Sequence, residues 1–441
     1  MEYRAFRDQL FLLANKMRVE AELYYATGEA FSAGALDGAL DSYRCCKTAG
    51  LGLRVYTGGK TGYAYTEELS APQAFLAHAI DNAAATGQND PHPMQHPADY
   101  PACPAQAYPI LTMSNREKID LALAMEAAAK TLDKRVCRVK RCAVSTSVSE
   151  ITIDNTHGLH AFHAQAGGSC VLAPVLEQNS QTQSEYAFRV NQTAHMIDAC
   201  AQEAVQKTAA RFGGEAAPTG EYRVLLHAEA AGDLLAAFSP MFSADMAQKV
   251  LSPLRGMENE IIAAACISLV DDPLHPDFSR PFDGEGTPAR KNRIVHNGQF
   301  LTLLHNLKTA QKANTASTGN AARTASSPIG VAPGNFFILP GNASFDTLLT
   351  NLSDGLLITD ISGLHAGAHP VNGRFSLIAK GFFVKNGIVG KPVERITVAG
   401  SFLELLRDTE MVGSDLLFGL PGMSRIGSPS LLVPKLMVAG R

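Results

Sequence analysis

The chain has 441 residues, of which 46% are hydrophobic and 18% are charged, the composition of a globular protein with enough apolar material for two or three domains. Its formal net charge is -4, so no overall positive field favours nucleic acid, although Arg135, Arg138, Lys140 and Arg141 form a short basic cluster. No run of 18 apolar residues occurs, which argues against a membrane-spanning helix. We therefore expect a cytoplasmic protein whose eight cysteines are free thiols.

The first 66 residues carry three local patterns. Apolar residues from Tyr3 to Met17 recur at three- and four-residue steps, which predicts an amphipathic helix rather than a signal peptide. Alternation from Val19 to Tyr25 predicts a half-buried strand. Two apolar runs flank Gly58, Gly59 and Lys60, and this arrangement predicts a β-hairpin.

Helices and strands follow in the rest of the first half. Ser70 and Pro72 are expected to open a helix, and residues 87–113 to form a proline-rich strap across the surface. Ser114 and Glu117 have the spacing of a capping box. The buried stripe of the helix that follows is predicted at Leu121, Met125, Ala128 and Leu132. Strands are expected from about 136 to 188, with a turn at 155–158, and a helix from about 191 to 211.

A glycine- and proline-bearing stretch at 213–220 marks the predicted domain boundary. Beyond it, a strand at 222–226 leads into a helix from about Glu229, and hairpin turns are expected at 297–298 and 386–387. Short helices are expected at 344–352 and 401–407. Strand runs with segregated helices indicate an α+β fold, with domains at 1–212 and 220–441.

Several motifs resemble chemical sites without meeting their requirements. The tripeptide Gly59-Lys60-Thr61 lacks the earlier glycine and the following helix of a phosphate-binding loop, so a hairpin is expected. His157, His160 and His163 alternate faces on a strand and are not expected to converge on one metal.

The segment 224–235, VLLHAEAAGDLL, stands at a strand-to-helix junction. A zinc peptidase helix needs two histidines one turn apart with a glutamate beside them, but His227 has no second histidine within a turn. Glu229 stands some 200° around an ideal helix from His227 and could not serve the same metal. A satisfied, partly buried His227 at a helix start is the preferred interpretation. His365 and His369 lie in a glycine-rich loop that could line a cleft.

The segment at 224–235 resembles a motif of the TldD/PmbA family, whose members have been called modulators of DNA gyrase. The resemblance covers essentially the whole chain and is strongest after residue 220. It continues through LVDDP (269–273), FDGEGTPARKNRIVHNGQF (282–300), STGNAAR (317–323), residues 355–387 and GSPSLLV (427–433).

In the TldD-like branch of that family, the motif is His-Glu-x-x-x-His, completed by a late cysteine. Here His227 matches the first histidine, whereas Ala228 and Gly232 stand at the other two positions, and no cysteine follows Cys266. The chain therefore resembles the TldE/PmbA branch, which lacks the zinc motif.

The resemblance implies a two-domain α+β fold and a subunit without metal or cofactor of its own. Zinc would be held by a TldD-like partner subunit, in a peptidase complex acting on peptides and unfolded chains. It further implies cleft-lining or peptide-binding roles, and no catalytic role, for His227, Glu229, Ser317, Thr318, Asn320, Arg323, His365 and His369.

Two alternatives remain open. The chain could be a homodimeric peptidase that assembles an unorthodox metal site from His227, His365 and His369. It could instead modulate DNA gyrase without being an enzyme, through protein contacts, because the acidic balance argues against direct binding of nucleic acid.

Overall fold

The computed structural model describes residues 1–86, 92–104, 108–191, 196–420, 422 and 424–440. They form two compact units. Unit 1 comprises Met1–Ala209 with two later segments, Ser279–Ala289 and Asn306–Gly330; unit 2 comprises Ala210–Phe278, Arg290–His305 and Val331–Arg441. Both units combine helices with strands that pair mainly in the antiparallel direction, which confirms the predicted α+β class.

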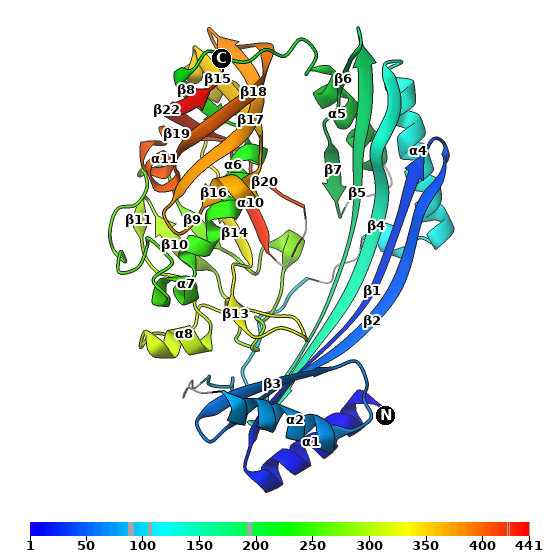
Figure 1. Cartoon of the computed structure of the whole chain (residues 1–441), viewed down its shortest axis with the longest axis vertical. Helices are drawn as coiled ribbons and strands as arrows, with labels where there is room; N and C mark the ends of the chain where they lie inside the picture. Colours follow the sequence, from blue (N-terminus) through cyan, green and yellow to red (C-terminus); the bar gives the residue numbers. More distant parts are fainter. Residues whose placement is uncertain (87–91, 105–107, 192–195, 421, 423, 441) are drawn as a thin grey trace. The chain divides into compact units, whose positions relative to one another are not determined.

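Unit 1 is built on one seven-stranded sheet in the order β3-β2-β1-β4-β5-β6, with β7 pairing with β5 (Figure 1). Its strands are β1 (Glu20–Leu36), β2 (Ala39–Thr57), β3 (Lys60–Thr66), β4 (Val136–Asn155), β5 (His160–Gln178), β6 (Gln181–Gln183) and β7 (Ala187–Val190). The helices are α1 (Tyr3–Met17), α2 (Pro72–Ala85), α3 (Pro109–Thr112), α4 (Asn115–Leu132), α5 (Met196–Ala209) and, in a later segment, α8 (Leu307–Lys312); β12 (Ala321–Ala322) follows α8.

Different helices cover the two ends of this sheet. At one end α1 and α2 pack on one face of β1–β3, where Phe6, Leu10, Leu53 and Phe75 share a buried core. At the other end α4 and α5 lie against β4 and β5 (Figure 1).

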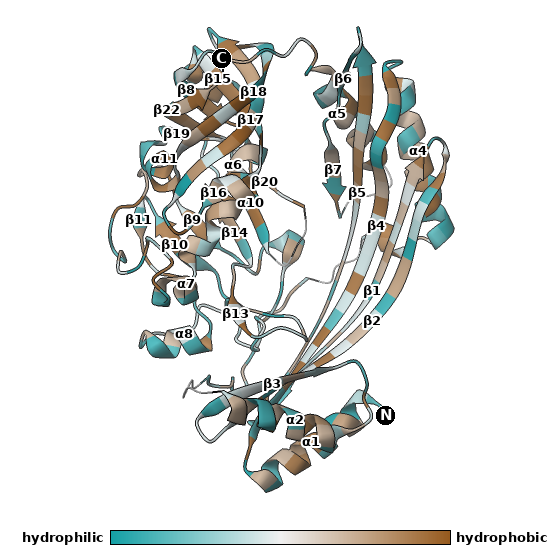
Figure 2. Cartoon of the chain, viewed as in Figure 1, coloured by the Kyte–Doolittle hydropathy of each residue, from teal (hydrophilic) through white to brown (hydrophobic). Residues whose placement is uncertain are grey.

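Unit 2 contains a closed sheet and an open one. In the closed sheet β15 (Gly355–Ser362) pairs with both β8 (Gly220–Leu226) and β17 (Arg374–Lys385), so the order β15-β8-β22-β18-β17 returns to β15. The other strands of this sheet are β16 (Ala368–His369), β18 (Ile388–Ser401), β19 (Met411–Val412) and β22 (Leu431–Ala439). Its strands carry the hydrophobic runs that Figure 2 colours brown, and they supply much of the core of unit 2.

The open sheet has the order β11-β10-β9-β14-β21-β20. Its strands are β9 (Leu269–Asp271), β10 (Asn292–His296), β11 (Gln299–Phe300), β14 (Asn335–Ile338), β20 (Leu417–Phe418) and β21 (Arg425–Ser428), and the short β13 (Gly330–Val331) precedes β14. The helices are α6 (Ala228–Phe238), α7 (Ala244–Gln248), α9 (Phe345–Leu352), α10 (Leu364–Gly367) and α11 (Phe402–Asp408), with single 3-10 turns η1 (Ser239–Phe242) and η2 (Pro276–Phe278). No helix in the described ranges has both the length and the apolarity needed to cross a membrane.

Most local predictions are confirmed. The N-terminal helix, the hairpin at Gly58–Gly59 and the Ser114–Glu117 capping box all occur. The helix predicted at 191–211 is present as α5, and residues 192–195 of that prediction lie outside the described residues.

Three local predictions are wrong in detail. Ser70 does not cap α2, because the N-cap position is Ala71, which makes no side-chain cap. The predicted buried stripe of α4 is confirmed at Met125 but wrong at Leu132, which is 52% exposed; the helix buries Ala122, Glu126 and Ala129 instead. The segment after residue 91 does not run only over the surface, because His92 and Met94 are buried; residues 87–91 and 105–107 of the predicted strap lie outside the described residues.

Candidate functional site

His227 occupies the junction between β8 and α6 in unit 2. Its backbone N–H donates to the Ile358 carbonyl of the neighbouring strand at 2.8 Å. Its Nδ1 accepts from the Glu229 N–H at 3.3 Å, so the ring is the N-cap of α6. The ring also meets Phe345 edge-on, with the ring centroids 5.8 Å apart. His227 is therefore a partly buried helix-start histidine, as predicted from the sequence.

The residues beyond His227 do not fit a zinc site of the His-Glu-x-x-x-His kind. Ala228 is buried and offers only a methyl group. Gly232 has no side chain, and a Cβ built on it would lie 3.6 Å from the backbone nitrogen of Ser428, where α6 packs against β21. Within the described ranges, no group of three or more His, Cys, Asp or Glu side chains could hold a metal ion.

An acidic group lies on the same helix. Asp233 stands one turn after Glu229 on α6. Burial, reinforced by the negative charges of Asp360 and Glu229, raises the pKa of Asp233 to about 6. A carboxyl with that pKa changes its protonation within the physiological range. The i, i+4 spacing of Glu229 and Asp233 was the only sequence signal for this group, and Asp360 comes from β15, more than 120 residues later.

His365 and His369 lie in α10 and β16, and both side chains are exposed. Both short elements lie beside α6. The structure thus brings the elements that carry His365 and His369 to the helix that His227 caps.

The other four predicted residues belong to unit 1. Thr318 and Asn320 are buried, and the Thr318 hydroxyl donates to the Asn320 side-chain oxygen at 2.7 Å. Ser317 Oγ accepts from the Gly319 N–H at 3.2 Å. The loop continues into Ala321, whose N–H donates to Asp283 Oδ2 at 2.9 Å. This hydrogen bond links the two later segments of unit 1, Ser279–Ala289 and Asn306–Gly330, to each other.

Arg323 ends this loop in a buried ionic cluster, which we define as Glu22, Arg54, His92, Glu285 and Arg323. Arg323 Nη2 lies 2.9 Å from Glu22 Oε1, and its guanidinium stacks over the Tyr24 ring at 4.4 Å. Nε and Nη2 of Arg54 donate to the two carboxylate oxygens of Glu22 at 3.1 and 2.8 Å. Although burial acts to raise it, the nearby Arg54 and Arg323 hold the pKa of Glu22 below its usual value.

Glu285 is the second acid of the buried ionic cluster. Its Oε1 lies 2.5 Å from His92 Nε2 and 3.5 Å from Arg54 Nη1, and its Oε2 accepts from the Leu307 N–H. Burial raises the pKa of Glu285, and burial also lowers the pKa of His92. His92 is therefore neutral, and its Nδ1 lies 3.4 Å from the Tyr63 hydroxyl.

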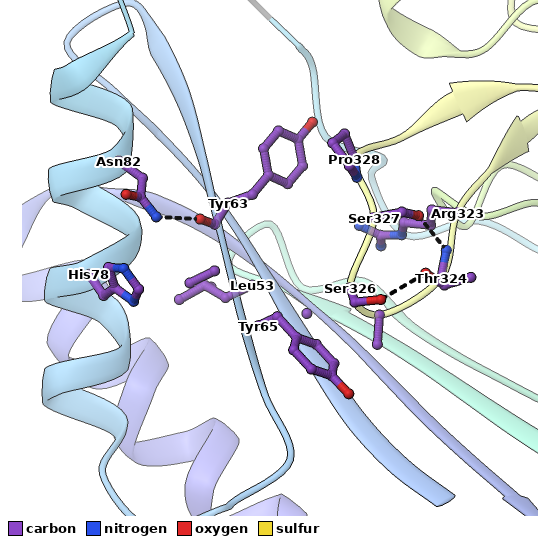
Figure 3. Close-up of a pocket in the computed structure, with 13 residues that line it drawn as sticks. Leu53, Tyr63, Tyr65, His78, Asn82, Arg323, Thr324, Ser326, Ser327 and Pro328 are labelled. Carbon is purple, nitrogen blue, oxygen red and sulfur yellow. Dashed lines mark hydrogen bonds between the residues drawn. The ribbon is translucent and has the colours of Figure 1, made fainter.

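A pocket of about 400 Å³ lies beside the buried ionic cluster, in unit 1 (Figure 3). Its walls come from strands β2 and β3, helix α2 and the loop 323–328. Arg323 belongs to the buried ionic cluster and also lines the pocket. Tyr63 lines the pocket as well, and its hydroxyl contacts His92 of the cluster.

Sequence reasoning identified Arg323 but missed its partners. The alternation from Val19 to Tyr25, which predicts a half-buried strand, gives no sign that the Glu22 side chain is 0% exposed. The sequence did carry one signal of a buried acidic group, namely the two acids Asp283 and Glu285 in an otherwise apolar and glycine-rich stretch. His157 and His160 pair with Glu20 and Asp154, and the His163 ring meets Phe282 edge-on, so these three histidines do not converge.

Comparisons with known proteins place the chain in a family. Models of three domains match it: PmbA/TldA metallopeptidase domain 1 at residues 21–86, the central domain at 108–212 and the C-terminal domain at 219–440. The metalloprotease PmbA of Escherichia coli O157:H7 is 26% identical over 407 residues, covering 89% of this chain and 86% of the relative.

Solved structures agree over the full length. A crystal structure from Thermotoga maritima, described as a modulator of a DNA gyrase, is 32% identical with a TM-score of 0.92, covering 99% of this chain and all of that one. TldE from Thermococcus kodakarensis has the same fold, with a TM-score of 0.90 at 23% identity and the same coverage. The chain belongs to the PmbA/TldA metallopeptidase family.

Proposed function

We propose that this chain is the subunit without a zinc motif, of the TldE/PmbA kind, in a two-subunit metallopeptidase that acts on peptides and unfolded chains. The observation that carries the proposal is the start of α6. There His227 serves as a helix cap, and Ala228 and Gly232 stand where a zinc-bearing relative would need a base and a second ligand. Zinc and the attack on the peptide bond are assigned to a TldD-like partner.

Within such a complex, the chain would contribute peptide-binding surface rather than catalysis. His227, Glu229, His365 and His369 lie on neighbouring elements of unit 2, and Ser317, Thr318, Asn320 and Arg323 lie in one loop of unit 1. Main-chain hydrogen bonds to an extended substrate would tolerate varied sequences.

The test combines the chain with a TldD-like subunit from the same organism. Cleavage of unfolded casein, co-elution by size-exclusion chromatography with light scattering, and zinc content by elemental analysis are measured for each protein alone and for the mixture. We expect zinc in the partner, co-elution, and cleavage that requires the mixture.

The same measurements on His227→Ala separate the alternatives. Stoichiometric zinc in the chain alone that disappears in His227→Ala, together with cleavage by the chain alone, would establish the homodimeric peptidase instead. A change in gyrase supercoiling on adding the chain, without cleavage or co-elution in any mixture, would favour the gyrase modulator.

A further inference from the structure

The pocket in unit 1 opens at the outer edge of a sheet. Strand β3 ends the strand order β3-β2-β1-β4-β5-β6, so one side of β3 has no neighbouring strand among the residues that the structure describes. The pocket is lined there by Tyr63 and Tyr65 of β3, by His78 and Asn82 of α2, and by the loop 323–328 (Figure 3).

The outer edge of β3 carries main-chain groups that point away from β2. Tyr63 lies opposite Arg54, and Tyr65 lies opposite Gly52, in antiparallel register. The Tyr63 carbonyl accepts from Asn82 Nδ2 at 2.8 Å, so it faces outward (Figure 3). Because outward and inward pairs alternate along an antiparallel ladder, the N–H and C=O of Tyr65 face outward as well. Such an edge accepts an added strand.

The opposite wall of the pocket is held rigidly in place. A Cβ on Gly52 would lie 2.3 Å from the Ala325 carbonyl oxygen, so the loop 323–328 rests directly on the backbone of β2. Ser327 Oγ accepts from the Thr324 N–H at 2.8 Å, and the hydroxyls of Thr324 and Ser326 are 3.3 Å apart. The pocket is therefore formed before any ligand arrives.

The loop 323–328 begins with a positively charged residue, Arg323. The side chain of Arg323 is 4% exposed and lines the pocket. Its Nε and Nη2 are buried without a hydrogen-bond partner among the described residues, because the contact of Nη2 with Glu22 is a charge contact that lacks hydrogen-bond geometry. The negative charge of Glu22 must also neutralise Arg54, whose guanidinium donates hydrogen bonds to both carboxylate oxygens of Glu22. A guanidinium in this position is suited to a carboxylate ligand.

We propose that this pocket binds the C-terminal end of an extended peptide. The peptide main chain adds to the outer edge of β3 at Tyr65, and its terminal carboxylate is held by Arg323 with the hydroxyls of Thr324 and Ser326. The proposal rests on the proposed function in one respect, namely that the ligand is a peptide. It adds a second peptide site, within unit 1, that recognises a chain terminus.

The test measures binding to the full-length chain alone by fluorescence anisotropy. The probe is an unstructured octapeptide labelled with fluorescein at its N-terminus and carrying a free C-terminal carboxylate. We expect the C-terminal amide of the same peptide, and a version with N-methylated backbone amides, each to bind at least about tenfold more weakly. Equal binding of the carboxylate and the amide would overturn the proposal.

A protein variant provides the second arm. Ser326 is exposed, so Ser326→Trp should fold and fill the pocket, whereas Ser147→Trp changes an exposed serine of β4 outside the pocket. We expect Ser326→Trp to abolish binding and Ser147→Trp to leave it unchanged; equal binding by the two variants would overturn the site. Binding without cleavage in the mixture with a zinc subunit would refute only the proposed function, and cleavage without binding would refute only this pocket.

Discussion

Arg54 and Glu22 stand directly opposite each other on β2 and β1, and both side chains are 0% exposed. Two hydrogen bonds join them, so the planar guanidinium matches both carboxylate oxygens. A slip of one residue between the strands would place each of these charges against an apolar neighbour. The pair therefore fixes the register of β1 against β2 as well as the position of Arg323.

Replacing Arg54 by methionine should strongly destabilise the protein. Glu22 would lose both of its hydrogen bonds from Arg54, and Glu285 would lose a charge partner at 3.5 Å. Removing one member of a buried ion pair costs about 3–5 kcal/mol of unfolding free energy. Equilibrium denaturation in urea, followed by circular dichroism, measures the change.

Lys47→Met is the matched control, because Lys47 and Glu29 also face each other across β1 and β2 and form an ion pair, but both are exposed. This variant should change the unfolding free energy by less than about 1 kcal/mol. A similar loss in both variants would show that burial is not what makes the Arg54 pair important.

Gly52→Ala should destabilise unit 1 for a steric reason. The new methyl group would lie 2.3 Å from the Ala325 carbonyl oxygen, and backbone atoms can yield only by moving the loop 323–328. Forcing extra volume into a packed site costs about 1–3 kcal/mol. Thermal unfolding measures the loss, and Gly330→Ala serves as control, because its nearest contact would be an ordinary 3.8 Å. Equal melting temperatures for the two variants would contradict the close approach.

The features predicted from sequence are those that depend on neighbouring residues. The Gly58–Gly59 turn and the Ser114–Glu117 capping box need only a few consecutive positions, and both form. The junction at His227 could also be predicted from the sequence, because a strand, a capping residue and a helix follow one another directly.

The buried ionic cluster could not be predicted in the same way. Glu22, His92, Glu285 and Arg323 come from four segments up to about 300 residues apart, and each is surrounded in sequence by residues that give it no partner. Glu22 in particular alternates with apolar residues and so matches the pattern of a solvent-facing position. Only tertiary packing shows that both faces of this strand are covered.

Ser114→Ala and Ser70→Ala should differ although both serines precede helices. Ser114 Oγ accepts from the Glu117 N–H, whereas the N-cap of α2 is Ala71, which Ser70 precedes. Loss of a capping side chain costs about 1 kcal/mol. We expect that loss for Ser114→Ala, and a change near zero for Ser70→Ala, in urea denaturation. A loss of similar size for Ser70→Ala would show that this serine stabilises α2 after all.

Asp233→Asn should stabilise the protein in a pH-dependent manner. Burial and the charges of Asp360 and Glu229 raise the pKa of Asp233 to about 6, above the usual value of 3.8. Between about pH 4 and pH 6 the folded state holds a proton that the unfolded state releases, so stability is lost as the pH rises through that window. The variant removes this loss. It should match the wild type near pH 4 and exceed it by up to about 3 kcal/mol at pH 8.

Urea denaturation of Asp233→Asn and the wild type at pH 4, 6 and 8 measures the difference in unfolding free energy. Asp41→Asn, the same change at an exposed carboxylate on β2, is measured alongside as the control variant. If Asp233→Asn were less stable than the wild type at pH 8, the carboxylate would be making a favourable contact that outweighs its burial. Burial of Asp233, reinforced by the charges of Asp360 and Glu229, would then not be the dominant effect at this position of α6.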